Sequence, residues 1–62
     1  MIAKKRLYSL VETAIYIGRT PGAVRELAWK GTLSTVRLDG RIFFDVRDLD
    51  DLIEKCKNRE LN

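Results

Sequence analysis

The stretch IGRTPGAVRELAWKG, residues 17–31, decides the fold of this chain. Gly18 stands where a left-handed helix stop is expected, because glycine adopts that conformation at little cost. Thr20 is a good N-cap, and Pro21 follows at the first helical position, where its missing amide is not needed. Gly31 ends the second helix in the same way. Helices joined by so tight a turn must cross steeply, which predicts helix-turn-helix geometry.

The second helix, predicted from Pro21 to about Lys30, has two faces. The face suited to a core carries Val24, Leu27 and Ala28. The opposite face carries Gly22, Arg25, Glu26 and Trp29. The only tryptophan of the chain is therefore predicted to point away from the core.

Length and composition allow one small folded domain. The chain has 62 residues, of which 45% are hydrophobic and 34% are charged, as in a soluble globule. No apolar run approaches the roughly 20 residues that cross a membrane, and no secretory signal is recognisable. The simplest prediction is a cytoplasmic protein with no membrane partner.

Side-chain chemistry argues against catalysis and metal binding. The chain has one cysteine and no histidine, so the commonest general base and metal ligand is missing. No nucleophile has a base to activate it, and so small a chain has no room for a substrate pocket. We expect no enzyme, cofactor, metal site or small-molecule substrate.

Charge is divided unequally along the chain. Residues 1–41 hold eight basic and three acidic residues, a balance of +5, and residues 42–62 hold four basic and six acidic, a balance of −2. A basic N-terminal part and an acidic C-terminal part fit a protein that presents one side to a polyanion. The alternative is ordinary solubility charge, since charge clusters of this size are common on protein surfaces.

The first helix is predicted over residues 10–17. Ser9 and Glu12 have the spacing of a capping box, in which each side chain satisfies a backbone amide at the helix start. The core-facing stripe of this helix is Leu10, Ala14 and Ile17. The helix therefore has both a defined start and a buried face.

A hairpin follows in STVRLDGRIFFDV, residues 34–46, with Asp39 and Gly40 as its turn signal. A two-residue turn would pair Leu38 with Arg41 and would split the apolar side chains between two faces. A three-residue loop over residues 38–40 keeps the apolar set together, and is therefore preferred. That set is Val36, Leu38, Ile42 and Phe44. The preferred register leaves Arg37 and Phe43 pointing outward.

The last helix is predicted to begin after Asp45, an N-cap candidate, with Asp48 in its first turn. Its apolar stripe is Val46, Leu49, Leu52, Ile53 and Cys56. Cys56 is expected to be a small buried residue rather than a reactive thiol. The chain then divides into a loosely ordered basic arm at 1–6, a folded domain at 7–57 and a flexible tail at 58–62.

The order helix, turn, helix, hairpin, helix predicts an α+β, mostly helical fold. LYSLVETAIYIGRTPGAVRELAWKGTL and VRLDGRIFFDVRDLDDLIEK resemble the excisionase-like winged helix-turn-helix domains, relatives of the DNA-binding part of MerR-type regulators. ETAIYIG stands where E-A-A-x-Y-L-G is usual, and the second segment resembles the V-R-x-G-x-R and D-L-D/E-x-x-I patterns of the wing and closing helix. The resemblance covers about residues 7–55.

The resemblance implies duplex DNA binding, with the second helix in the major groove and the hairpin as a wing on the neighbouring backbone or minor groove. The family's groove positions correspond to Thr20, Gly22, Arg25 and Glu26, and its wing positions to Arg37 and Arg41. Pro21 and Gly22 differ from the polar or basic residues usual there, which leaves fewer side chains for reading bases.

Each proposed contact has an alternative. Arg25 can bind a guanine edge, a contact worth about 1–3 kcal/mol, or it can meet a phosphate or remain solvated. Glu26 can accept from a cytosine amine, orient Arg25 or remain solvated. Arg37 and Arg41 suit phosphates or the narrow minor groove, although charge on a hairpin edge also discourages aggregation. The helix start at Thr20 offers amides to a phosphate.

Trp29 has three alternatives: packing between the second helix and the wing, contact with DNA sugars, or anchoring a protein interface. Phe43, if outward, is a second candidate anchor. Lys4, Lys5 and Arg6 are expected to add nonspecific attraction to phosphates.

The leading prediction is a non-catalytic, sequence-specific DNA-binding protein of the cytoplasm and nucleoid. By resemblance, it is an excisionase or a small phage-type transcriptional regulator of prophage origin. Its partners would be double-stranded DNA and either an integrase or further copies of itself on adjacent sites. The alternative is a protein-interaction module with Trp29 and Phe43 as anchors. RNA binding is less favoured, since no stacking-aromatic sheet is predicted.

Overall fold

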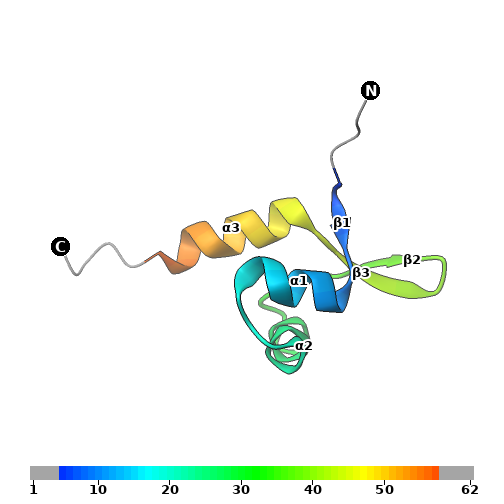
Figure 1. Cartoon of the computed structure of the whole chain (residues 1–62), viewed down its shortest axis with the longest axis horizontal. Coiled ribbons are helices and arrows are strands. Elements are labelled where there is room, and N and C mark those ends of the chain that lie inside the picture. The colour runs from blue at the N-terminus through cyan, green and yellow to red at the C-terminus, as the bar shows by residue number, and fades with distance from the viewer. Residues whose placement is uncertain (1–4, 58–62) are drawn as a thin grey trace.

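The computed structural model of the chain describes residues 5–57 and has an α+β fold (Figure 1). Its elements are β1 (Leu7–Tyr8), α1 (Leu10–Ile17), α2 (Pro21–Trp29), β2 (Val36–Leu38), β3 (Arg41–Asp45) and α3 (Val46–Cys56). The three strands form an antiparallel sheet in the order β1-β3-β2. The β2–β3 hairpin and α3 extend in opposite directions from the α1–α2 pair. Residues 1–4 of the predicted arm and the predicted tail lie outside the described residues.

The predicted caps of α1 and α2 are confirmed. The Ser9 hydroxyl accepts from the Glu12 amide at 3.2 Å, and the Glu12 carboxylate accepts from the Ser9 amide at 2.9 Å. Gly18 is left-handed at φ 74°, and the Thr20 hydroxyl caps α2 by accepting from the Ala23 amide at 3.2 Å. Figure 1 shows α1 from the side and α2 nearly end-on, so the two helices cross steeply.

The hairpin has a two-residue turn, and the predicted three-residue loop is wrong. The strand pairs are Val36–Phe43, Arg37–Ile42 and Leu38–Arg41. Asp39 and Gly40 both have positive φ, 56° and 77°, a geometry that matches the right-handed twist of the strands. The predicted register assumed that the whole apolar set reaches the core. Leu38 and Ile42 instead lie beyond it, with 53% and 49% of their surface exposed.

One small core joins all three helices and the sheet. Its buried hydrophobic members are Ala14, Val24, Leu33, Phe44 and Leu49. The stripe of α3 leaves this core gradually: Leu49 is buried, Leu52 is half-buried and Ile53 is 37% exposed. Cys56 is exposed, so its predicted burial is wrong. The reason is that α3 continues past the end of the core, which among the described residues reaches along this helix only to Leu52.

The first strand was not predicted, because two residues are too short to show an alternating pattern. Leu7 pairs with Asp45 and Tyr8 pairs with Phe44. The carbonyl of Arg6 accepts from the amide of Val46 at 2.8 Å. The end of the predicted arm is therefore held against the junction between β3 and α3.

Candidate nucleic-acid interface

The outward face of α2 is open, as its sequence predicts. Gly22, Arg25 and Glu26 are exposed, and Trp29 has 87% of its surface exposed. The indole therefore does not brace the helix against the hairpin, and that alternative is wrong. Arg25 and Trp29, four residues apart, line a shallow hollow together with Ala28. A cation and a large aromatic surface are thus presented side by side.

The start of α2 permits close approach by another molecule. Thr20 and Gly22 are both exposed. A Cβ atom built on Gly22 would meet nothing nearer than the Thr20 hydroxyl, at 4.0 Å. Within residues 5–57, the backbone at Gly22 is therefore accessible.

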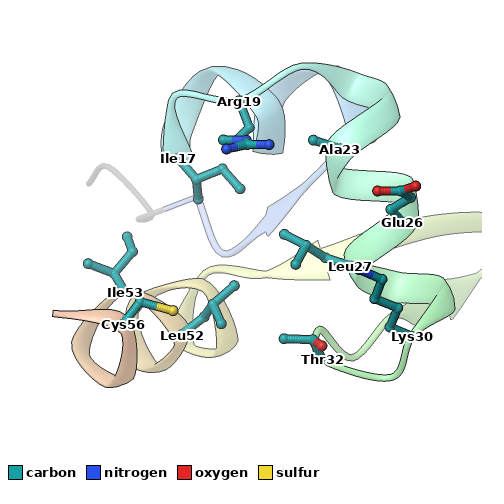
Figure 2. A pocket seen from close by; sticks show the side chains of 10 residues that line it. All are labelled: Ile17, Arg19, Ala23, Glu26, Leu27, Lys30, Thr32, Leu52, Ile53 and Cys56. Atoms are coloured by element: carbon teal, nitrogen blue, oxygen red, sulfur yellow. The ribbon is translucent and has the colours of Figure 1, made fainter. Parts of the chain in front are cut away.

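Glu26 lies on a different flank of α2 from Arg25. It lines an open groove between α2 and α3, here called the α2–α3 groove, which has a volume of about 450 Å³ (Figure 2). The apolar lining consists of Ile17, Ala23, Leu27, Leu52, Ile53 and Cys56. The charged lining consists of Arg19, Glu26 and Lys30. Within residues 5–57 the Arg25 guanidinium donates no hydrogen bond to Glu26, so the alternative in which Glu26 orients Arg25 has no contact to support it.

The hairpin presents its arginines on opposite faces. Arg37 lies across from Ile42, whereas Arg41 lies across from Leu38, one position further along the ladder. Adjacent positions on a strand point to opposite faces, so the two guanidinium groups leave the ribbon on different sides. The predicted register would have put them on one side. Both side chains are exposed.

Phe43 is half-buried, and it lies on the face of the hairpin opposite the buried Phe44. It shares a face with Val36, its cross-strand partner, and with Arg41. The aromatic surface that it offers to another molecule is therefore smaller than predicted.

The described cations before α1 are held within the molecule. Lys5 pairs with Glu12 and lies 5.6 Å from the centre of the Tyr8 ring. Arg6 binds Asp45 in bidentate fashion, through Nε at 3.1 Å and Nη2 at 2.9 Å from the same carboxylate oxygen and Nε at 3.3 Å from the other. Of the residues predicted to attract phosphates, these two already have carboxylate partners. Lys4 lies outside the described residues.

These contacts shift the protonation of the two acids. Arg6, followed by the Arg47 amide at 2.9 Å, holds the pKa of Asp45 below its ordinary value. Lys5, followed by the Ser9 amide, does the same for the pKa of Glu12. Both carboxylates are therefore favoured in their charged forms, as neutralising partners of the N-terminal cations.

Arg25, Arg37 and Arg41 form no side-chain hydrogen bond or ion pair within residues 5–57. All seven predicted contact residues are exposed; they are Thr20, Gly22, Arg25, Glu26, Trp29, Arg37 and Arg41. They divide into a helix group, a hairpin group and Glu26 at the α2–α3 groove.

The sequence did not single out Arg19 or Lys30, which lie with Glu26 along the groove. Only their places in the sequence could have indicated this: Arg19 follows the glycine that ends α1, and Lys30 lies one helical turn after Glu26. Nor did it predict the pair between Arg6 and Asp45, which are 39 residues apart.

The chain matches no protein-family model, and searches of curated proteins and of solved structures gave no match either. Across residues 5–57, no helix is long and apolar enough to cross a membrane. The same residues contain no cluster of three or more Cys, Asp and Glu side chains arranged to hold a metal ion.

Proposed function

We propose that this chain is a winged helix-turn-helix protein that binds double-stranded DNA sequence-specifically and without catalysis. In this proposal α2 enters the major groove, and the β2–β3 hairpin is the wing. The element order, the steep α1–α2 crossing and the tight turn between them support this reading.

One observation carries the proposal: the cations on α2 and the hairpin have no partner in the described chain, whereas those at the N-terminal end do. Arg25, Arg37 and Arg41 are exposed and unpaired. An unpaired guanidinium loses no intramolecular contact when it binds a phosphate or a guanine edge. A polyanion is therefore the partner that this surface suits best.

Each element would make a different kind of contact. Arg25 would read a base or hold a phosphate, while Trp29, at the last turn of α2, would pack on sugars at the groove wall. The open first turn at Gly22 would let the backbone approach a phosphate. In the wing, Arg37 and Arg41 on opposite faces would reach the two walls of a minor groove. Glu26, on the groove flank, would contribute least.

Biologically, the proposal is an excisionase or a small phage-type regulator that acts in the cytoplasm, on the nucleoid. Several copies on adjacent sites would shape DNA for an integrase or for transcription. No small-molecule substrate is required. The biological role rests on the resemblance of the sequence to the excisionase-like winged helix-turn-helix domains.

The test uses Trp29 as a unique fluorophore, because it is the only tryptophan of the chain. At low salt, titration with prophage attachment-region and promoter duplexes should change its emission, together with an electrophoretic shift. Binding should weaken steeply as salt is raised, since phosphate contacts release counterions. The absence of any shift with every duplex at low salt would rule the proposal out.

A protein-interaction module is the second candidate, and the 87% exposure of Trp29 favours it. Phe43, half-buried, would be the weaker anchor. The two functions respond oppositely to substitution. An interaction module should tolerate Arg25→Ala and Arg41→Ala but fail with Trp29→Ala. DNA binding should be weakened most by the arginine changes.

A further inference from the structure

Trp29 lies near the middle of the α2 face that the proposed function places in the major groove. At 100° per residue it is turned by only about 20° from Gly22 and about 40° from Arg25. Along the helix axis it lies about 6 Å from Arg25, which is close to two base-pair steps of about 3.4 Å. When Arg25 reaches a base edge, the indole of Trp29 therefore faces the groove floor one or two base pairs away.

The side chains at this position offer hydrogen-bond donors and apolar surface. Arg25 has a guanidinium group, Trp29 has one indole N–H, and neither side chain carries an acceptor. Neither forms a side-chain hydrogen bond within residues 5–57. They share their hollow with Ala28. Glu26, the only acidic residue of α2, lines the α2–α3 groove instead. The hollow therefore holds donors without a carboxylate.

Two of the four bases match such a surface in the major groove. Guanine presents two acceptors, N7 and O6, and thymine presents the acceptor O4 beside its C5 methyl group. The amines of adenine and cytosine would instead face donors. Arg25 suits guanine, whereas Trp29 suits thymine, because the indole combines apolar surface with a single N–H.

The hollow is large enough for this contact. Its volume is about 240 Å³, and it is open to the outside. It can therefore take a thymine methyl group together with the adjoining deoxyribose, so the sugar contact of Trp29 described above is kept. Sugars are the same at every base pair, whereas the methyl group marks one base.

We propose that Trp29 determines sequence specificity: the hollow formed by Arg25, Ala28 and Trp29 receives the C5 methyl group of a thymine. This thymine lies one or two base pairs from the guanine that Arg25 binds. The assignment rests on the proposed function and adds to it which bases α2 recognises.

The test removes the methyl group from the DNA. A duplex library with a random central region, selected by electrophoretic shift at low salt, supplies the tightest site. Each thymine of that site is then replaced in turn by deoxyuridine, which keeps O4 and lacks only the methyl group. Anisotropy of a labelled duplex should show wild-type affinity weakened about fourfold at one thymine, the change expected for one methyl group returned to water. Replacement at the other thymines should change it little.

Variants of Trp29 assign the effect to the indole. Trp29→Ala should bind the thymine and uracil duplexes equally, since nothing remains to contact the methyl group. Trp29→Phe keeps an apolar ring without the N–H, so it should bind more weakly overall and still distinguish the two duplexes. The matched control is Ile15→Ala, which shortens an apolar side chain on α1 that is 76% exposed and should keep the fourfold difference. Circular dichroism checks that each variant is folded.

The position of the thymine is tested with 7-deazaguanine, which lacks the N7 acceptor. At one guanine this base should weaken binding by the wild-type chain but not by Arg25→Ala. That guanine should lie one or two base pairs from the sensitive thymine. A greater separation would contradict a shared hollow.

Two further results would overturn the thymine assignment and leave DNA binding intact. They are equal wild-type affinity for the thymine and every uracil duplex, and a uracil effect that persists in Trp29→Ala. A selected site without thymine would contradict it in the same way. The failure of every duplex to bind at low salt is a distinct result, because it would rule out the proposed function together with this assignment.

Discussion

The N-terminal end and the α2–hairpin side of this molecule use the same kind of residue differently. Lys5 and Arg6 are bound to carboxylates of α1 and of the β3–α3 junction. Arg25, Arg37 and Arg41 are exposed without partners in residues 5–57. Net charge counts both groups alike, but only the second is free to neutralise another molecule. Charge therefore becomes informative about function only after its internal partners are known.

Removing the unpaired arginines should have the largest effect on DNA binding. The triple variant Arg25→Ala, Arg37→Ala and Arg41→Ala should lose about 1000-fold in affinity at low salt, at roughly tenfold per contact. The dependence of affinity on salt should also become shallower. Thermal stability should hardly change, because none of the three has a partner to lose within the part of the chain that the structure describes.

Matched controls make that prediction specific. Arg47→Ala with Lys55→Ala removes two exposed cations from α3 and should change affinity little. The triple change to lysine keeps the charge but loses bidentate geometry, so its affinity should be intermediate. If the α3 variant weakens binding as much as the triple alanine variant, the contrast between the two regions is wrong.

The turn between the two strands that carry the wing arginines should be the next most sensitive position. Gly40 has φ 77° and no atom within 4 Å of a built Cβ, so Gly40→Ala costs backbone strain without a clash. We expect about 1 kcal/mol of lost stability, since an L-residue there costs about 1–2 kcal/mol and alanine recovers part through the unfolded state. Urea unfolding measures it. Gly40→Asn, which tolerates this conformation, should lose less, and equal losses would point to a cause other than φ.

The paired side should respond in stability and not in DNA binding. Arg6→Ala should lower the melting temperature by a few degrees, because it removes a bidentate pair but leaves the β1–β3 ladder. Asp45→Asn keeps an N-cap for α3 and should have a similar effect. The double variant should melt little below either single one, since both remove the same contact. Additive losses would show that the two residues act separately.

The dependence of stability on acidic pH should report on the Arg6–Asp45 and Lys5–Glu12 pairs. Asp45 and Glu12 have lowered pKa values, chiefly because of Arg6 and Lys5 respectively. A carboxyl whose folded pKa lies below its unfolded pKa adds stability that is complete above the unfolded value. That stability is lost as pH falls through the folded value. The free energy of unfolding should therefore be level near neutral pH and should fall below about pH 4. Arg6→Ala should make the fall shallower, and identical profiles would exclude this linkage.

The sequence predicts a feature of this molecule well when the residues that determine the feature are close together in the chain. The ends of α1 and α2 follow from Ser9, Gly18, Thr20 and Pro21, which act through backbone conformation and hydrogen bonds within one turn. The outward face of α2 follows from helical periodicity alone. The exposure of Gly22, Arg25 and Glu26 could therefore be predicted, whereas that of Trp29 stayed open, because packing against the hairpin was an alternative at the same position.

The wrong predictions share one cause, which is the extent of the core. The hairpin register and the burial of Cys56 were both inferred by assuming that apolar residues continue to be buried. A chain this small does not have a core that reaches the hairpin tip or the last turn of α3. The Arg6–Asp45 pair escaped prediction because it joins positions 39 residues apart, and no local rule relates them.

The smallest change in stability should come from Gly22→Ala. This substitution also separates an effect on stability from an effect on DNA binding. Glycine in an exposed helix costs stability relative to alanine, and a Cβ here would meet only the Thr20 hydroxyl at 4.0 Å, an ordinary contact. Gly22→Ala should therefore raise the free energy of unfolding by about 0.5 kcal/mol. If the first turn of α2 approaches a DNA phosphate closely, the same methyl group should weaken binding although the protein is more stable. Unfolding and titration on one variant measure both. A variant that is more stable and binds as well as wild type would show that DNA does not approach α2 at its first turn, and would leave Arg25 and Trp29 as the contacts of this helix.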